Sequence, residues 1–421
     1  MVRCRGVFGF LYWTALLLGI SAFAKTPKNI ILFIGDGMGM EQLEVGRIYL
    51  SAHEFVLDTF PAKGKVTTCN IHGTLKNGSC DPNASTVTDS AAAATAIATG
   101  NKVSNGVLSL AEPGDRSPLS TILEKMKRKK KSTGLVTTCL STDATPAAFG
   151  AHVVRRAQAK DIGTQYFAAS TPNVIFGASW PFMKAMAASS PAKYKVVDSL
   201  TGLNTFQEEI RKGKWPCKKD RCPHVLGAFG SYPLLPTWEK ELGGTMPLEA
   251  SGDTAFKAAD VPHLSEMAKA AVDVLAQNKN GFFLMVESGL IDWIGHKYPF
   301  FKDQEGEPKA VEALAKEMKE ANETLRYLTA FTKAHPDTLL VVTADHETGG
   351  LKVKKDETLC LGKKGCIPSV EWTSPVVDAY GGKFAEHTKA DVAVFATGTN
   401  AQLFDGKMDN TEFSKKMLSA D

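Results

Sequence analysis

Short apolar runs alternate along the chain with longer stretches of helical periodicity. Five runs have the length and the β-branched or aromatic content of buried strands: Asn29–Ile34, Gly134–Thr138, Phe282–Val286, Leu339–Thr343 and Val392–Ala396. The helical patterns between them include Ser120–Lys130, Leu264–Asn278 and Glu307–Ala334. Strands that alternate with helices predict an α/β fold, a three-layer sandwich around a large, mostly parallel central sheet.

Four of the five predicted strands stop at or next to side chains of the kind that bind metals. These are Asp36, Thr142-Asp143, Glu287 and Asp345-His346. The carboxyl ends of parallel strands are where sites assemble in α/β proteins. A carboxylate at the end of a buried strand loses hydration unless a cation or another partner compensates. Four such ends together indicate one shared metal site.

Several of these residues are ambiguous when they are considered singly. Asp36 lies in Gly35–Gly39, where Asp-Gly is also a common turn signal. Asp292 and His296 are four residues apart, which on a helix gives two ligands on one face or an ordinary structural hydrogen bond. His387 alone could be a surface histidine. Only the complete set favours a metal site.

One serine lies at the start of an alanine-rich helical segment, in Thr88-Asp89-Ser90-Ala91. Serine alone is a poor nucleophile near neutral pH, and the chain offers no obvious base for Ser90 but many potential metal ligands. This combination indicates metal-activated attack of Ser90 on an anionic ester.

The composition is that of a globular protein, with 43% hydrophobic and 22% charged residues in 421. A net charge of +4 gives no sign of a nucleic-acid-binding surface, and the basic run Lys125–Lys131 is typical of a solvated helix end. We find no internal repeat. We expect one catalytic domain over residues 25–421, with surface insertions near 213–253 and 352–383.

The first 24 residues have the pattern of a cleaved signal peptide. Arg3 and Arg5 precede the apolar stretch Val7–Ile20, and Ala22-Phe23-Ala24 supplies a cleavage site. A membrane anchor is less favoured, because the apolar stretch is shorter than a spanning helix of about 20 residues. No later segment is long enough to span. We therefore expect an exported protein, whether periplasmic, at the cell surface or secreted.

The cysteines that remain after the leader fit the same compartment. Six of them form three local pairs in polar loops, which we expect to be disulfides: Cys69–Cys80, Cys217–Cys222 and Cys360–Cys366. Cys139 ends an apolar run and is expected to be a buried free thiol. A zinc site built from these cysteines is the alternative, but their spacings are irregular.

Six blocks in this order resemble the alkaline phosphatases, and the resemblance covers essentially the whole mature chain. The blocks are Asn29–Gly39 with its Asp-Gly-Met-Gly, Asp89–Ala92, Asp143–Pro146 followed by Arg156, Met285–Glu287, Thr343–His346 and Glu386–Thr388. The resemblance implies hydrolysis of small phosphate monoesters at alkaline pH through a phosphoserine on Ser90. It also implies the fold of that family and a homodimer.

The resemblance further implies a site for two zinc ions and one magnesium ion. The implied ligands are Asp292, His296 and His387 for one zinc, Asp36, Asp345 and His346 for the other, and Asp36, Asp143, Thr145 and Glu287 for magnesium. Arg156 would hold two phosphate oxygens, and Asp89 would orient it. Imidazole with carboxylate suits zinc, and an all-oxygen set suits magnesium, which agrees with this division.

Two departures from the family pattern concern the substrate and the metals. Trp293 follows Asp292 where the enterobacterial members have a lysine and the animal members a histidine, so we expect it beside the phosphate. The Asp143-Ala144-Thr145 block resembles the bacterial magnesium site. The short segment between His346 and His387 predicts no large dimer-capping insertion.

Three other functions are alternatives to the hydrolysis of phosphate monoesters. A sulfatase would need a Cys-x-Pro-x-Arg-like block, which the sequence lacks. A phosphodiesterase usually has threonine as its nucleophile and lacks the magnesium carboxylates and the arginine, so Asp143, Glu287 and Arg156 favour monoesters. A non-catalytic exported protein that binds metal or phosphate would be expected to have lost Ser90 or a zinc ligand.

Overall fold

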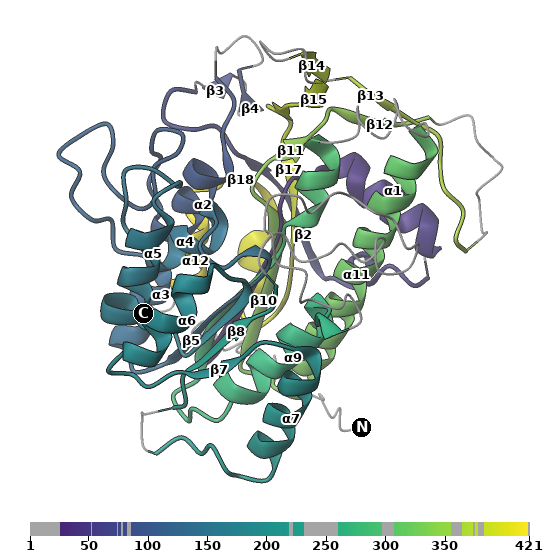
Figure 1. Cartoon of the computed structure of the whole chain (residues 1–421). Coiled ribbons are helices and arrows are strands. Elements are labelled where there is room, and N and C mark those ends of the chain that lie inside the picture. The colour runs from purple at the N-terminus through teal and green to yellow at the C-terminus, as the bar shows by residue number, and fades with distance from the viewer. Residues whose placement is uncertain are drawn as a thin grey trace, which may run out of the picture.

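The computed structural model describes residues 26–419 apart from 52, 74, 77–78, 82–85, 219–221, 231–259, 297–306, 355–363, 374 and 378–382. The predicted signal peptide and Cys360 therefore lie outside the described residues, as does most of the predicted insertion at 213–253. A large twisted sheet runs through the middle of the molecule, with helices on both sides (Figure 1).

Within the described residues the central sheet has ten strands, in the order β18, β2, β17, β10, β1, β9, β5, β6, β8 and β7. Their bounds are β1 Asn29–Gly35, β2 Ala62–Thr67, β5 Ser132–Leu140, β6 Val174–Ala178, β7 Lys195–Val197, β8 Val225–Ala228, β9 Phe282–Ser288, β10 Thr338–Ala344, β17 Val392–Gly398 and β18 Gly406–Asp409. All run parallel except β17, which is antiparallel to both of its neighbours.

Helices cover both faces of the sheet. On one face α9 packs against β5 and α11, and α1 and α7 join that layer; on the other, α3 and α4 pack against β5, while α2 and α12 continue the layer. The helix bounds are α1 Met40–Leu50, α2 Ser90–Thr99, α3 Ile122–Arg128, α4 Ala144–Gly150, α5 Ala159–Gln165, α6 Pro181–Ser189, α7 Leu200–Arg211, α9 Leu264–Leu275, α11 Glu307–Ala334 and α12 Glu412–Leu418. The predicted three-layer sandwich is confirmed.

The shorter elements lie around this core. The 3-10 helices η1 (Val56–Thr59) and η4 (Ala401–Phe404) and the π-helical turn η2 (Tyr166–Ser170) connect larger elements. Four two-stranded ladders stand outside the main sheet: β3 Leu75–Lys76 with β4 Ser79–Cys80, β11 Glu347–Thr348 with β16 His387–Thr388, β12 Leu351–Val353 with β13 Val370–Trp372, and β14 Pro375–Val377 with β15 Lys383–Ala385. The described part of the predicted insertion at 352–383 thus contains short strands outside the central sheet.

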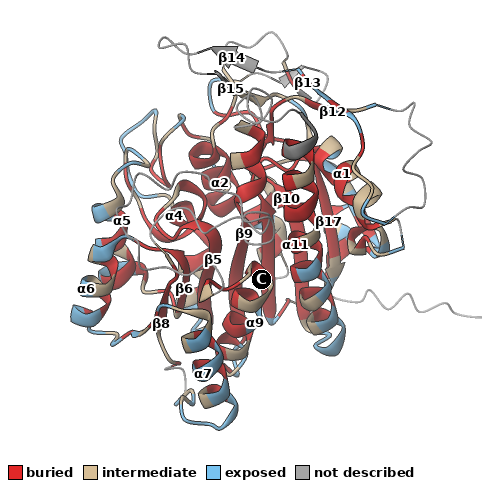
Figure 2. Cartoon of the chain, turned by 45° about the vertical axis from the view of Figure 1, so that its right-hand side comes forward, coloured by how far each residue is buried: buried red, intermediate tan, exposed pale blue. Residues whose placement is uncertain are grey.

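The five predicted strands and three predicted helices are all present, and all but the third helix have shifted ends. Buried residues fill the middle strands, which lack an exposed face (Figure 2). The first of the predicted helices begins at Ile122 because Thr121 caps it: its side chain accepts from the Glu124 amide while Glu124 reaches back to the Thr121 amide. The second stops at Leu275, and the third keeps its predicted bounds.

The disulfides Cys69–Cys80 and Cys217–Cys222 are confirmed, as is the buried free thiol of Cys139. Cys366 is also in a disulfide, although its predicted partner lies outside the described residues. Of the helices that the structure describes, none has the length and apolar character needed for a membrane span.

An ion pair ties α3 to the segment after α4. His152 Nε2 lies 2.9 Å from Glu124 Oε1, and His152 Nδ1 donates to the Ser109 carbonyl at 2.8 Å. Burial would lower the pKa of His152, but the hydrogen bonds to Glu124 and Ser109 raise it above 6.5. Burial would raise the pKa of Glu124, but the hydrogen bonds from His152 and Thr121 hold it below 4.5.

The pair should therefore stabilise the fold most between these two values. Its contribution is lost as the pH falls through the lowered pKa of Glu124, and again as the pH rises through the raised pKa of His152. We expect His152→Gln to lower the free energy of unfolding by about 1 kcal/mol near pH 5.5 and by less near pH 9. Urea unfolding at both pH values measures this. An equal loss of unfolding free energy at the two pH values would contradict a stabilising ion pair.

Candidate active site

The predicted ligands gather at one edge of the sheet because of strand direction and register. Gly35 at the end of β1 lies opposite Ala344 of β10 and Ser288 of β9, so the residues that follow or flank these positions are neighbours. Since β17 runs the other way, its amino end reaches the same edge. The ladder that precedes β17 therefore brings His387 beside the ends of the parallel strands.

Ser90 is the first residue of α2 and is only 3% exposed. The helix starts here because Asp89 caps it, with one carboxylate oxygen accepting from the Ala92 amide at 2.9 Å. The whole helix is buried, so small alanine side chains allow it to pack closely on α4. The hydroxyl of Ser90 thus lies at the positive end of a rigid, buried helix.

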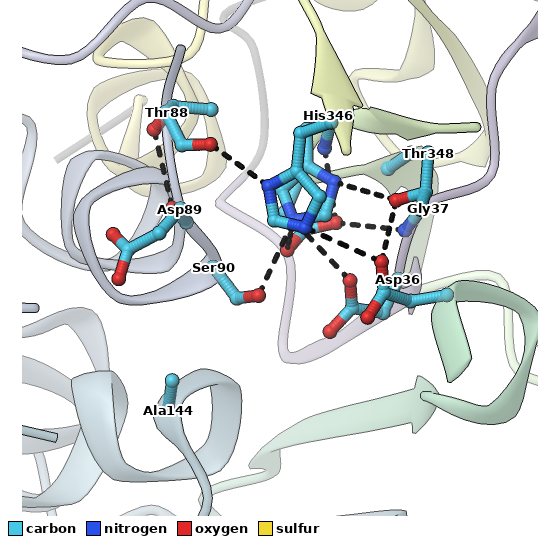
Figure 3. Close-up of polar contacts among 12 residues, drawn as sticks. Asp36, Gly37, Thr88, Asp89, Ser90, Ala144, His346 and Thr348 are labelled. Carbon is cyan, nitrogen blue, oxygen red and sulfur yellow. Dashed lines mark hydrogen bonds and ion pairs between the residues drawn. The ribbon is translucent and has the colours of Figure 1, made fainter. Parts of the chain in front are cut away.

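The first cluster of ligand atoms, which we call the Ser90 cluster, comprises Asp36, Asp345 and His346. Figure 3 shows Asp36 and His346 beside Ser90. Nε2 of His346 lies 3.2 Å from Ser90 Oγ, 3.1 Å from Asp345 Oδ2 and 3.4 Å from Asp36 Oδ1. Asp345 and His346 have no exposed surface. Three oxygens therefore lie within 3.4 Å of one buried nitrogen.

The Ser90 cluster fits a bound cation. Within the described part of the chain, the buried atoms Asp36 Oδ1 and Asp345 Oδ2 accept no hydrogen bond. Burial, together with the charges of Asp345, Asp292 and Glu287, raises the pKa of Asp36 well above its usual range. Carboxylates packed so closely are costly to ionise unless a positive ion joins them. The imidazole and carboxylate donors are of the kind that zinc prefers.

The second cluster, the His387 cluster, comprises Asp292, His296 and His387. Asp292 and His296 lie on a helical segment at 290–296, as their spacing predicts. The two histidine Nε2 atoms are 3.0 Å apart, and Asp292 Oδ1 lies 3.3 Å from one and 3.4 Å from the other. Burial would lower the pKa of His387, but the hydrogen bond and charge of Asp292 raise it to about 9.

Backbone carbonyls orient both histidines of this cluster. His296 Nδ1 donates to the Ala385 carbonyl, and His387 Nδ1 donates to the Thr88 carbonyl at 2.9 Å. A carbonyl can only accept, so each Nδ1 carries the proton and each Nε2 lone pair is free to bind a metal when the ring is neutral. Two facing lone pairs beside a carboxylate fit a zinc ion, so this donor set also agrees with the implied metal.

An all-oxygen set lies near Asp36, close enough for the charge of Glu287 to raise the pKa of Asp36. Thr137 and Glu287 are opposite each other in β5 and β9, and the threonine hydroxyl donates to the Glu287 carboxylate. Burial raises the pKa of Glu287 to about 8, with the hydrogen bond from Thr137 acting against it and the charge of Asp143 acting with it. Thr145, on α4, is also buried beside Glu287. These oxygens suit magnesium.

Arg156 connects this oxygen set to the nucleophile. One of its amino groups donates to Asp143 Oδ1 at 3.0 Å, and the other lies 3.5 Å from Asp89 Oδ2. Asp89 thus both caps the Ser90 helix and contacts the guanidinium group. An arginine held between two carboxylates is fixed in orientation, and its planar fork matches two oxygens of a phosphate.

The profile of the family described as alkaline phosphatase matches residues 27–365. The chain belongs to the alkaline phosphatase family. It is similar to alkaline phosphatase 3 of Bacillus subtilis, with 28% identity over 93% of this chain and 88% of the relative. It is also similar to the streptomycin-6-phosphate phosphatase of Streptomyces griseus, with 29% identity over 99% of both chains.

Solved structures agree with this assignment. The crystal structure of a cold-active alkaline phosphatase from Shewanella has a TM-score of 0.68 and 26% identity, over 93% of this chain and 99% of that one. The alkaline phosphatase of Thermus thermophilus, at 22% identity and a TM-score of 0.69, shows the same fold. The protein is therefore an enzyme of the alkaline phosphatase type.

The structure of this alkaline phosphatase brings the predicted site residues together at one edge, with half-buried Trp293 directly after Asp292. Three residues that sequence analysis did not single out orient the ligands: Thr88, Thr137 and Thr348. Thr88 and Thr348 adjoin or follow the family blocks, but threonine spacing carries no signal of its own. Only the folded chain shows what they contact.

Proposed function

We propose that this alkaline phosphatase hydrolyses small phosphate monoesters to an alcohol and inorganic phosphate, with Ser90 as the nucleophile that becomes phosphorylated. The observation that carries the proposal is the position of the Ser90 hydroxyl. It lies at a buried helix amino terminus, 3.2 Å from His346 Nε2, beside two buried carboxylate oxygens that accept no hydrogen bond within the described residues.

The proposal includes two zinc ions and one magnesium ion. The Ser90 cluster would hold one zinc and the His387 cluster the other, and the magnesium ligands would be Asp36, Asp143, Thr145 and Glu287. When bound, the ions would lower the pKa of the reacting hydroxyl and water and stabilise the charge on the attacking and leaving oxygens.

The chain's own residues supply the rest of the reaction. Arg156 would hold two phosphate oxygens and align the phosphorus with Ser90 Oγ. The Ser90 hydroxyl loses its proton to solvent and its oxygen bonds to phosphorus, while the bond from phosphorus to the alcohol oxygen breaks. The leaving oxygen takes a proton from solvent and departs as the alcohol. The amino end of α2 favours the anionic oxygen of Ser90. Water then attacks the phosphoserine, loses a proton, and releases phosphate and Ser90.

An alkaline pH optimum for turnover follows from the second half of this cycle, because the attacking water must lose a proton. The Streptomyces griseus relative is named as a phosphatase of streptomycin-6-phosphate, which supports phosphate monoesters as the substrate class. Export and a homodimer complete the proposal. The two disulfides in the described residues support export.

Turnover of p-nitrophenyl phosphate against bis-p-nitrophenyl phosphate, across pH and with zinc and magnesium supplied, tests the proposed function. We expect the monoester to be strongly preferred and its turnover to rise into alkaline pH. A preference for the diester would place the enzyme among phosphodiesterases. If the folded, metal-loaded protein turned over neither ester, the non-catalytic binding protein would be the better description.

Arg156 should set the preference for monoesters, since only a monoester offers the additional unesterified oxygen that its fork can hold. We expect Arg156→Ala to lower kcat/KM for the monoester by about 10²-fold to 10³-fold, and that for the diester far less. Arg155→Ala is the matched control, because that neighbouring arginine is exposed. Equal losses of kcat/KM for the two esters would show that Arg156 does not distinguish a monoester from a diester.

A further inference from the structure

Thr348 lies between the two ligand clusters and belongs to neither. It is the last residue of β11, is fully buried, and lies opposite His387 in the two-residue ladder of β11 and β16. Its backbone carbonyl accepts from Gln42 Nε2 at 2.9 Å, which fixes the strand to α1. The backbone of Thr348 is therefore held in one place by its own contacts.

The hydroxyl of Thr348 contacts one ligand from each cluster, and Figure 3 shows its contact with His346. It donates to Asp292 Oδ1 of the His387 cluster, and an ionised carboxylate can only accept. Its lone pair is then available to His346 Nδ1, 3.3 Å away in the Ser90 cluster. This direction places the imidazole proton on Nδ1 and directs the Nε2 lone pair toward Ser90, Asp345 and Asp36.

Packing on both sides confines the same side chain. A Cβ atom at Gly37 would lie 2.7 Å from Thr348 Oγ1, and one at Gly295 would lie 2.9 Å from Thr348 Cγ2. Gly37 follows the ligand Asp36, and Gly295 precedes the ligand His296. Thr348 therefore touches backbone that carries ligands of both clusters, and there is little space for another rotamer.

We infer that Thr348 is a positioning residue that couples the two clusters, so that zinc bound in one strengthens zinc binding in the other. The inference rests on the proposed function, which places zinc in both. With an ion bound in the His387 cluster, the carboxylate of Asp292 would be fixed. Asp292 would then fix the Thr348 hydroxyl, and this hydroxyl would fix the ring of His346. The same chain of contacts acts in the reverse direction, because coupling between two binding sites is reciprocal.

A zinc titration of metal-free protein against a competing chromophoric chelator tests this coupling. We expect wild-type protein to take up two zinc ions cooperatively. Thr348→Val keeps the shape but removes the hydroxyl, so zinc affinity should fall about 10-fold to 100-fold and the two steps should separate. Thr348→Ser should restore cooperative binding. Thr324→Val is the control, because the buried Thr324 hydroxyl donates within α11, to the Glu320 carbonyl at 3.0 Å, and within the described residues contacts neither cluster.

The outcomes distinguish the coupling from the proposed function. Wild-type protein that neither binds two zinc ions nor hydrolyses p-nitrophenyl phosphate would overturn both. Active wild-type protein together with a valine variant that binds zinc cooperatively and with unchanged affinity would overturn the coupling alone, as would equal losses in the valine and serine variants. Circular dichroism of the metal-free variants checks folding. If the valine variant does not fold, Thr348→Ala removes the same hydroxyl with less bulk.

Discussion

Ser90→Ala is expected to lower kcat for p-nitrophenyl phosphate by about 10³-fold or more. The hydroxyl that receives the phosphoryl group is removed, while the helix that carries it should stay intact, because alanine already occupies the next four positions of α2. Steady-state kinetics at alkaline pH with zinc and magnesium supplied measure the loss. Zinc content should change little, since all three members of the Ser90 cluster remain.

Ser104→Ala is the control for this substitution. Ser104 is a half-buried serine whose hydroxyl lies 3.0 Å from His72 Nε2, outside both clusters. The activity of Ser104→Ala should equal that of the wild type. A phosphoserine trapped by acid quenching in the wild type and missing from Ser90→Ala would support the assignment. Undiminished turnover by Ser90→Ala would exclude Ser90 as the nucleophile.

Asp345→Asn should remove zinc from the Ser90 cluster and activity with it. The substitution keeps the volume of a fully buried side chain but replaces a carboxylate oxygen, which accepts no hydrogen bond in the described part of the chain, with a neutral amide. Because a catalytic metal supplies several kcal/mol of stabilisation to the reacting charges, kcat/KM should fall about 10³-fold. Elemental analysis after gel filtration should show about one zinc ion fewer per chain.

Asp405→Asn provides the comparison. Asp405 accepts from the Lys63 amide at 2.9 Å on an exposed part of the chain, so its loss should change neither zinc content nor turnover. High zinc could restore part of the activity of Asp345→Asn if only affinity is reduced. A full complement of zinc in Asp345→Asn, with normal activity, would show that Asp345 is not a ligand.

Sequence patterns could predict the strand ends because burial and ligand chemistry are local. Asp36, Glu287 and Asp345 follow or finish apolar runs, and parallel strands bring such ends to one edge. The convergence of His387 on this edge could not be predicted from its loop alone. It depends on β17 running against its neighbours, and strand direction is a property of the whole sheet.

The contacts that the threonine residues of the site make also could not be predicted from the sequence. Thr137, Thr348 and the Thr88 carbonyl orient ligands, yet threonine is common in strands for reasons of shape alone. Five strands of the central sheet were missed as well: β2, β6, β7, β8 and β18. Several are short or carry exposed polar residues, so that apolar runs do not mark them.

The reversed strand β17 also sets the order in which the enzyme can mature. It lies between β10 and β2, so the early strand β2 has no neighbour linking it to the centre of the sheet until residues 392–398 have been synthesised. His387 enters the site with the same late segment. A nascent chain that already carries Ser90 and Asp36 but not yet residue 387 therefore lacks one of the proposed zinc ligands, and we expect no hydrolytic activity before this segment has been made.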